Sequence, residues 1–113
     1  MRNILFPLLA LLLCSQLWAT NAPKNDRIVG FWNSSSGAEL RLEYSGLPEE
    51  FVIVIQQGFR KEPLRYPAYW ADNLHFTYVS KDGLIQGRYD PASDRIFVRN
   101  PSGTWKSVWT RRP

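Results

Sequence analysis

The residues that could perform catalysis or hold a metal are few in this chain. His75 is the only histidine and Cys14 is the only cysteine. A zinc site needs several His or Cys ligands at workable spacing, and a histidine-based triad needs a positioned nucleophile and an orienting acid. Alternation along the chain puts His75 opposite Leu74 and Phe76, on an outward and solvated face. We therefore expect neither a metal nor another cofactor.

The carboxylates offer two further candidates for acid and base chemistry. Glu49 and Glu50 are adjacent, and a pair of acids can hydrolyse a glycosidic bond when both converge on it. Neighbours on a strand point to opposite faces, so these two side chains are expected to diverge into a solvated turn. Asp90 and Asp94 flank Pro91 and are interpreted as turn formers. With no convergent acid, base or nucleophile, we expect that the protein is not an enzyme.

Residues 1–22 have the pattern of an export signal. Arg2 precedes an apolar run from Ile4 to Leu13, and small residues follow at Ala19 and Ala22, where a signal peptidase could cut. The run is shorter than the roughly 20 residues that a membrane-spanning helix needs. We therefore expect a secreted or periplasmic protein, cleaved after Ala19 or Ala22, with no stable membrane anchor.

Cleavage would also remove Cys14, so we expect neither disulfides nor thiol chemistry in the mature protein. Leu13 precedes this cysteine, whereas a lipoprotein cysteine normally follows a small residue. Removing Arg2 from the 14 basic residues leaves 13 against 10 acidic ones, a net charge of +3. Because this charge is mild and interleaved along the chain, a nucleic-acid partner is not expected.

Residues 23–113 are predicted to form a single all-β domain. Apolar and polar residues alternate, as in Leu40 to Tyr44, and turn residues interrupt them roughly every eight to twelve positions. Pro67 falls inside one predicted strand and indicates a bulge or an unpaired edge. The predicted strands are Arg27–Asn33, Ala38–Ser45, Glu50–Gln57, Leu64–Ala71, Leu74–Ser80, Leu84–Tyr89, Asp94–Asn100 and Thr104–Arg112. Eight strands with short links favour an eight-stranded antiparallel up-and-down meander barrel, with a two-sheet β-sandwich as the alternative.

The two ends of the predicted barrel carry a distinctive set of residues. Gly30-Phe31-Trp32 lies on the first strand, and Arg111 and Arg112 end the last. This arrangement resembles the calycin superfamily of lipocalins, fatty-acid-binding proteins and avidins. The resemblance implies that Trp32 plugs one end of the barrel and that an arginine packs over its ring. Alternation places Arg111 on the same face as Trp109, so Arg111 is the better candidate for this closure by Gly30, Trp32 and Arg111.

Part of the sequence is similar to the avidin branch of that superfamily. Gly37 after the tryptophan is similar to its first hairpin, and Trp105-Lys106-Ser107 is similar to its last strand. The resemblance then fails at the biotin contacts, because Ser34 and Ala38 stand where that branch has an asparagine and a serine. Biotin is therefore not the expected ligand.

Large aromatic residues on the inward face could line a ligand cavity or fill the barrel. Small eight-stranded barrels do either, and rings of this size on short strands favour a mostly filled interior. The candidate ligand-binding residues are Tyr66, Trp70, Phe76, Tyr78, Tyr89, Trp105 and Trp109.

Two functions follow. The protein binds a small apolar or amphipathic ligand in the barrel mouth, or its outer surface binds an envelope protein, as an inhibitor or immunity-type factor does. For the outer surface, the outward residues predict a basic, aromatic patch suited to a protein or an anionic glycan; they are Arg60, Lys61, Arg65, Tyr69, Arg88 and Arg99.

Overall fold

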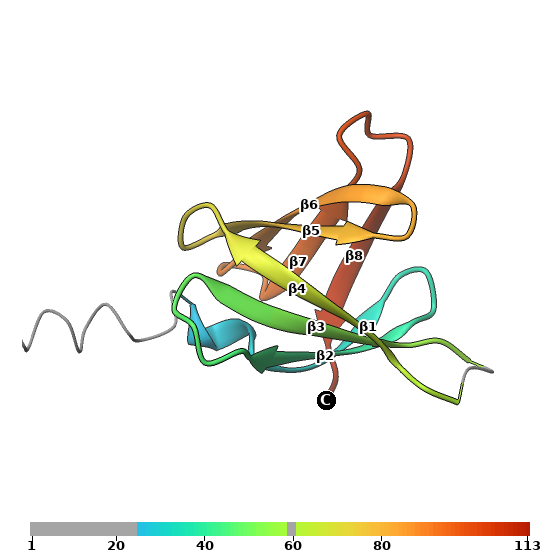
Figure 1. Cartoon of the computed structure of the whole chain (residues 1–113), viewed down its shortest axis with the longest axis horizontal. Helices are drawn as coiled ribbons and strands as arrows, with labels where there is room; N and C mark the ends of the chain where they lie inside the picture. The colour runs from blue at the N-terminus through green and yellow to red at the C-terminus, as the bar shows by residue number, and fades with distance from the viewer. Residues whose placement is uncertain (1–24, 59–60) are drawn as a thin grey trace, which may run out of the picture.

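Eight antiparallel strands follow one another around a closed barrel in the computed structural model, which describes residues 25–58 and 61–113 (Figure 1). Each strand pairs with its neighbours in sequence, and β8 returns to pair with β1. The strands are β1 (Gly30–Ser34), β2 (Glu39–Tyr44), β3 (Glu50–Gln56), β4 (Leu64–Trp70), β5 (His75–Ser80), β6 (Gly83–Asp90), β7 (Arg95–Arg99) and β8 (Lys106–Arg111). The predicted up-and-down barrel is confirmed, and the sandwich alternative is wrong.

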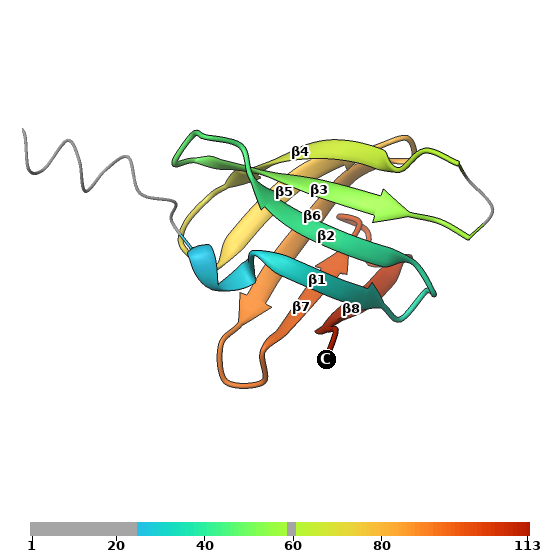
Figure 2. The same ribbon diagram turned by 90° about the horizontal axis from the view of Figure 1, so that it is seen from below.

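The predicted first strand begins three residues too early. Asp26–Ile28 instead forms a short 3-10 helix, η1, which lies at the end of the barrel where β1 begins (Figure 2). The side chain of Asn25 caps η1 by accepting a hydrogen bond from the backbone N–H of Arg27. The turn brings Ile28 into the core, where it is 1% exposed. A buried side chain that folds over the barrel end therefore replaces three residues of predicted strand.

The predicted last strand also begins too early, because Asn100 organises the turn before it. The Asn100 side-chain oxygen accepts from the backbone N–H of Trp105 at 3.1 Å, and the Asn100 backbone N–H donates to the Trp105 carbonyl. Trp105 is thereby held in the turn between β7 and β8, and β8 begins at Lys106.

Pairing between β4 and β5 is incomplete. β4 pairs with β3 from Leu64 onward, but it pairs with β5 only over Ala68 to Trp70. Pro67 is the last residue before that second ladder begins. A proline has no N–H to donate, so its position beside an unpaired edge agrees with the sequence-based expectation.

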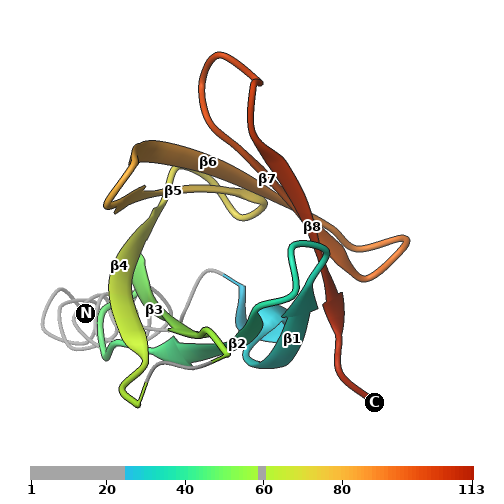
Figure 3. The ribbon, with the colours of Figure 1, turned by 90° about the vertical axis from the view of Figure 1, so that its right-hand side faces the viewer.

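The core fills the half of the barrel nearest η1. Phe51, Trp70 and Phe76 pack with ring centroids 5.0 to 5.6 Å apart, and Trp32 meets Tyr89 edge-on at 6.4 Å. We call this half the closed end; the hairpin turns β1–β2, β5–β6 and β7–β8 surround the other, open end, which faces the viewer in Figure 3. Within the described residues, no helix is long and apolar enough to span a membrane. The predicted export signal lies outside the described residues.

Candidate ligand pocket and the closed end of the barrel

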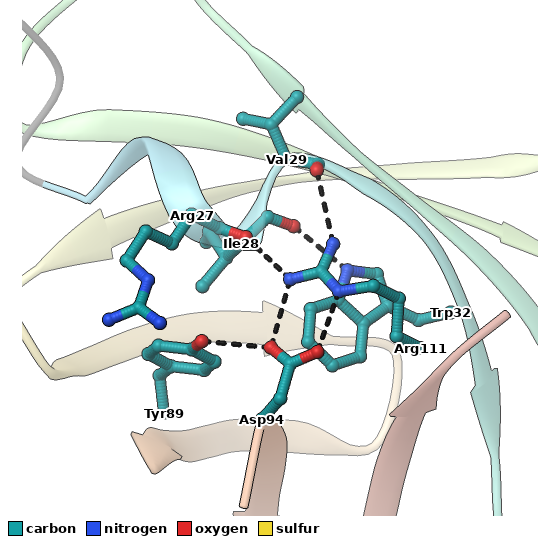
Figure 4. A network of polar contacts seen from close by, with 7 residues as sticks. All are labelled: Arg27, Ile28, Val29, Trp32, Tyr89, Asp94 and Arg111. Atoms are coloured by element: carbon teal, nitrogen blue, oxygen red, sulfur yellow. Dashed lines mark hydrogen bonds and ion pairs between the residues drawn. The ribbon is translucent and has the colours of Figure 1, made fainter. Parts of the chain in front are cut away.

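Trp32 and Arg111 meet at the closed end. They are cross-strand partners on β1 and β8, and the Arg111 guanidinium lies 4.3 Å from the centre of the Trp32 ring (Figure 4). The indole N–H of Trp32 donates to the Ile28 carbonyl at 2.8 Å, and the ring is fully buried. Gly30 has φ +137°, and a Cβ there would lie 3.3 Å from Arg111 Nη1. Glycine therefore supplies both the backbone conformation and the room that the arginine needs.

A hydrogen-bond network holds Arg111 in this position (Figure 4). Its Nε and Nη2 donate to the two carboxylate oxygens of Asp94 at 2.8 and 3.0 Å, and Nη2 and Nη1 also donate to the backbone carbonyls of Arg27 and Val29. The Tyr89 hydroxyl donates to Asp94 at 2.8 Å. One guanidinium and one carboxylate thus join β8, β6 and the β6–β7 turn to η1 and to Val29, the residue before β1.

Asp94 does more than the turn formation that its place after Pro91 predicts. Its φ of +51° lies in the left-handed region, which Asp and Asn tolerate better than most residues. The Arg111 guanidinium holds the pKa of Asp94 below its ordinary value, and hydrogen bonding from Tyr89 acts in the same direction. Spacing alone could not reveal this role, because Asp94 and Arg111 meet only when the barrel closes.

The Asp94 ion pair makes stability depend on pH. The pKa of Asp94 is lower in the folded state than in the unfolded state, where it is about 3.9. The ion pair therefore contributes fully to the free energy of unfolding above this unfolded-state value, and its contribution is lost as the pH falls through the folded-state pKa. Asp94→Asn, which suits the positive φ, should destabilise by about 1 kcal/mol or less at pH ~7, because solvent screens this partly exposed pair. Urea unfolding at pH ~7 and pH ~3 measures this effect. The difference in the free energy of unfolding between wild type and variant should be smaller at the lower pH, and an unchanged difference would contradict the prediction.

A pocket of about 660 Å³ opens at the opposite end of the barrel. Tyr66 and Tyr78 lie on its wall with ring centroids 5.9 Å apart, and Trp109 is 6.3 Å from Tyr78. Trp109 is also 6.3 Å from Phe76, so its buried ring separates the pocket from the core of the closed end. Leu40, Ile55, Leu64 and Ile85 complete the apolar lining. The expectation of a mostly filled interior therefore holds for the closed half of the barrel but not for the open half.

Four of the seven predicted ligand-binding residues line this pocket: Tyr66, Tyr78, Trp105 and Trp109. Trp70, Phe76 and Tyr89 do not line it, because they pack in the closed half with Phe51 and Trp32. Alternation identifies which residues point inward but not how far along the barrel axis each one lies. Trp105 reaches the pocket from the β7–β8 turn and is 40% exposed.

Polar residues at strand ends and in turns form the rim of the pocket. They are Ser34, Ser36, Ser80, Lys81, Asp82 and Asn100. The hydroxyl of Ser34 lies 2.7 Å from those of both Ser36 and Ser107, and Ser35 is 3.1 Å from Ser107. The run of serines at 34–36 is a sequence signal for this rim, although residues of this type before Gly37 indicate a turn and not a pocket.

The pocket wall also presents a protonated hydroxyl. Burial raises the pKa of Tyr78 well above its ordinary value, and the nearby Tyr66 adds to this shift. Tyr78 therefore stays neutral at physiological pH and can donate a hydrogen bond to a ligand.

The remaining candidates for chemistry lie outside the pocket. His75 is exposed, and its Nδ1 is 3.0 Å from the carboxylate of Asp72. In the described part of the chain, no three His, Cys, Asp or Glu side chains gather as a metal site would require.

Comparisons of the chain with family models, curated proteins and solved structures found no match. The interpretation of the pocket thus depends on its own geometry and on the closing residues.

Proposed function

We propose that the chain is an exported, calycin-like binding protein that holds a small apolar or amphipathic molecule in the open end of its barrel. The observation that carries this proposal is a pocket of about 660 Å³ in a barrel whose other end is closed. Ligand pockets for small molecules typically measure about 300 to 1,000 Å³. A barrel closed at one end has a single mouth, and a ligand in it would lose most of its contact with water.

The closing residues support the calycin-like part of the proposal. Arg111 stacks over Trp32 and bonds to the carbonyls of the segment that crosses the closed end. This is the arrangement that the resemblance implied for Trp32 and the terminal arginine. The barrel itself would be compatible with many functions, so the pocket carries the functional argument.

The lining favours a ligand with two chemical parts. Aromatic and aliphatic side chains form the wall, whereas serine hydroxyls, Asn100 and the charged residues Lys81 and Asp82 lie at the rim. An apolar portion would bury against Trp109 and its neighbours, and a polar portion would remain near the rim. The Tyr78 hydroxyl would donate to an acceptor on the ligand.

Native mass spectrometry of the protein purified from its own host tests the proposal directly, because a retained small molecule should appear with the folded protein. Titration with anilinonaphthalene sulfonate provides a second test, through quenching of tryptophan fluorescence. Trp105→Ala should lower the affinity for this probe by roughly fivefold, because about 1 kcal/mol of binding free energy from aromatic contact is lost.

Tyr69→Ala is the matched control, because Tyr69 is a similarly exposed aromatic residue (51%) that lies outside the pocket lining. It should leave the affinity for the probe unchanged. The proposal is wrong if the protein retains no small molecule and binds no probe. It is also wrong if both variants lower the affinity for the probe equally.

A further inference from the structure

The outer wall of the barrel carries a second hollow, of about 680 Å³, over strands β5 to β8. Its outward-facing side chains form two rows across the strands. Thr77 lies opposite Gln86, Gln86 opposite Arg99, and Arg99 opposite Lys106, while Arg88 lies opposite Phe97 in the adjacent row. We call this surface the β5–β8 groove. It lies on the other face of the strands from the barrel interior, so its role is independent of the open-end pocket.

The charges of the groove are all of one sign. Arg88, Arg99 and Lys106 line it and are exposed, and no acidic side chain is among its lining residues. Within residues 25–58 and 61–113, neither Arg99 nor Lys106 forms an ion pair, whereas Arg88 interacts electrostatically with Asp90. Like charges placed directly opposite each other on neighbouring strands destabilise a sheet, and Arg99 and Lys106 have this arrangement. An anion between them would remove that repulsion.

One of the three cations is held in place. The Arg88 guanidinium lies 5.0 Å from the centre of the half-buried Phe97 ring. Stacking on an aromatic face leaves the edge N–H groups of an arginine free, and that edge matches the geometry of a carboxylate. Arg88 therefore needs little reorganisation to bind one.

We infer that the β5–β8 groove binds a linear acidic oligosaccharide that carries carboxylate groups. The carboxylates would pair with Arg88, Arg99 and Lys106, and the sugar hydroxyls would bond to Thr77 and Gln86, which offer both donors and acceptors. An acidic peptide fits less well. The two central strands of the groove, β6 and β7, are paired on both sides and offer no free edge to which a peptide backbone could add.

Calorimetric titration with oligogalacturonate at low ionic strength tests this inference. Arg99→Gln and Lys106→Gln should each weaken binding by about tenfold, and the double variant should lose most of it. Both side chains are exposed and repel each other, so each variant should keep or slightly raise the thermal midpoint of the wild type. Added salt should weaken the wild-type interaction, because exposed charges are screened.

Lys61→Gln is the matched control, because it removes the same charge from an exposed lysine that lines neither the groove nor the open-end pocket. It should change the affinity for oligogalacturonate by less than about twofold. An equal loss in this control would show that net charge alone drives binding, and that outcome overturns the inference. Absence of binding, or equally tight binding of polyglutamate, also overturns it. None of these outcomes affects the proposal for the open-end pocket, which is tested by a different probe.

Discussion

Replacing Trp32 by alanine is expected to lower the free energy of unfolding by about 3 to 5 kcal/mol. The side chain is 0% exposed and lies between the Arg111 guanidinium and the core of the closed end. Alanine would leave a cavity too well fixed by surrounding strands to collapse, and it would also leave the Ile28 carbonyl without its 2.8 Å hydrogen bond. A domain of this size has little stability to spare, so a loss of this magnitude threatens the fold itself.

Urea unfolding followed by circular dichroism measures this loss. Trp32→Phe provides a milder variant that keeps an aromatic ring, and it should fall between the wild type and Trp32→Ala. Trp105→Ala is the matched control, because it removes the same side chain from a position that is 40% exposed. If Trp32→Ala cost no more than Trp105→Ala, the closing role of Trp32 would be refuted.

Hydrophobic alternation was sufficient to predict the barrel, because most of the strands have one wet and one dry face. In β2, Leu40 and Leu42 are buried while Arg41 and Glu43 are only half-buried. The short turns between strands then left few topologies other than a meander. The contact between Trp32 and Arg111 was implied by the calycin resemblance and not by alternation, and the folded chain contains it.

Other features depend on distances that a linear pattern does not contain. The depth of a side chain along the barrel axis depends on strand stagger, which is why Phe76 lies in the core whereas Tyr78, two residues later, reaches the pocket. The contact between Asp94 and Arg111 joins a residue of the β6–β7 turn to a residue of β8, 17 positions later in the chain. Local signals for the Asp94 turn were correct, but the partner that gives it a second role becomes visible only in the folded chain.

Strands β5 and β6 contain a close contact between Gly87 and the Phe76 ring, which a single methyl group on Gly87 should disrupt. Gly87 lies opposite Phe76 on the neighbouring strand, and the Phe76 ring occupies the space where a side chain would begin. A Cβ on Gly87 would lie 2.1 Å from Phe76 Cζ. The ring is 1% exposed and is packed against Phe51, Trp70 and Trp109, so it has no free space into which to move.

Gly87→Ala is therefore expected to destabilise the protein by about 1 to 3 kcal/mol or more, the usual range for overpacking a core. Gly58→Ala is the matched control and should change stability by less than about 0.5 kcal/mol, because a Cβ there meets nothing within 4 Å.

Phe76→Leu should make room for the methyl group that Gly87→Ala adds. Chemical unfolding of the two single variants and the double variant should then give a coupling energy of about 0.5 to 3 kcal/mol in favour of the pair. Additive losses would show that the Phe76 ring does not limit what position 87 can hold.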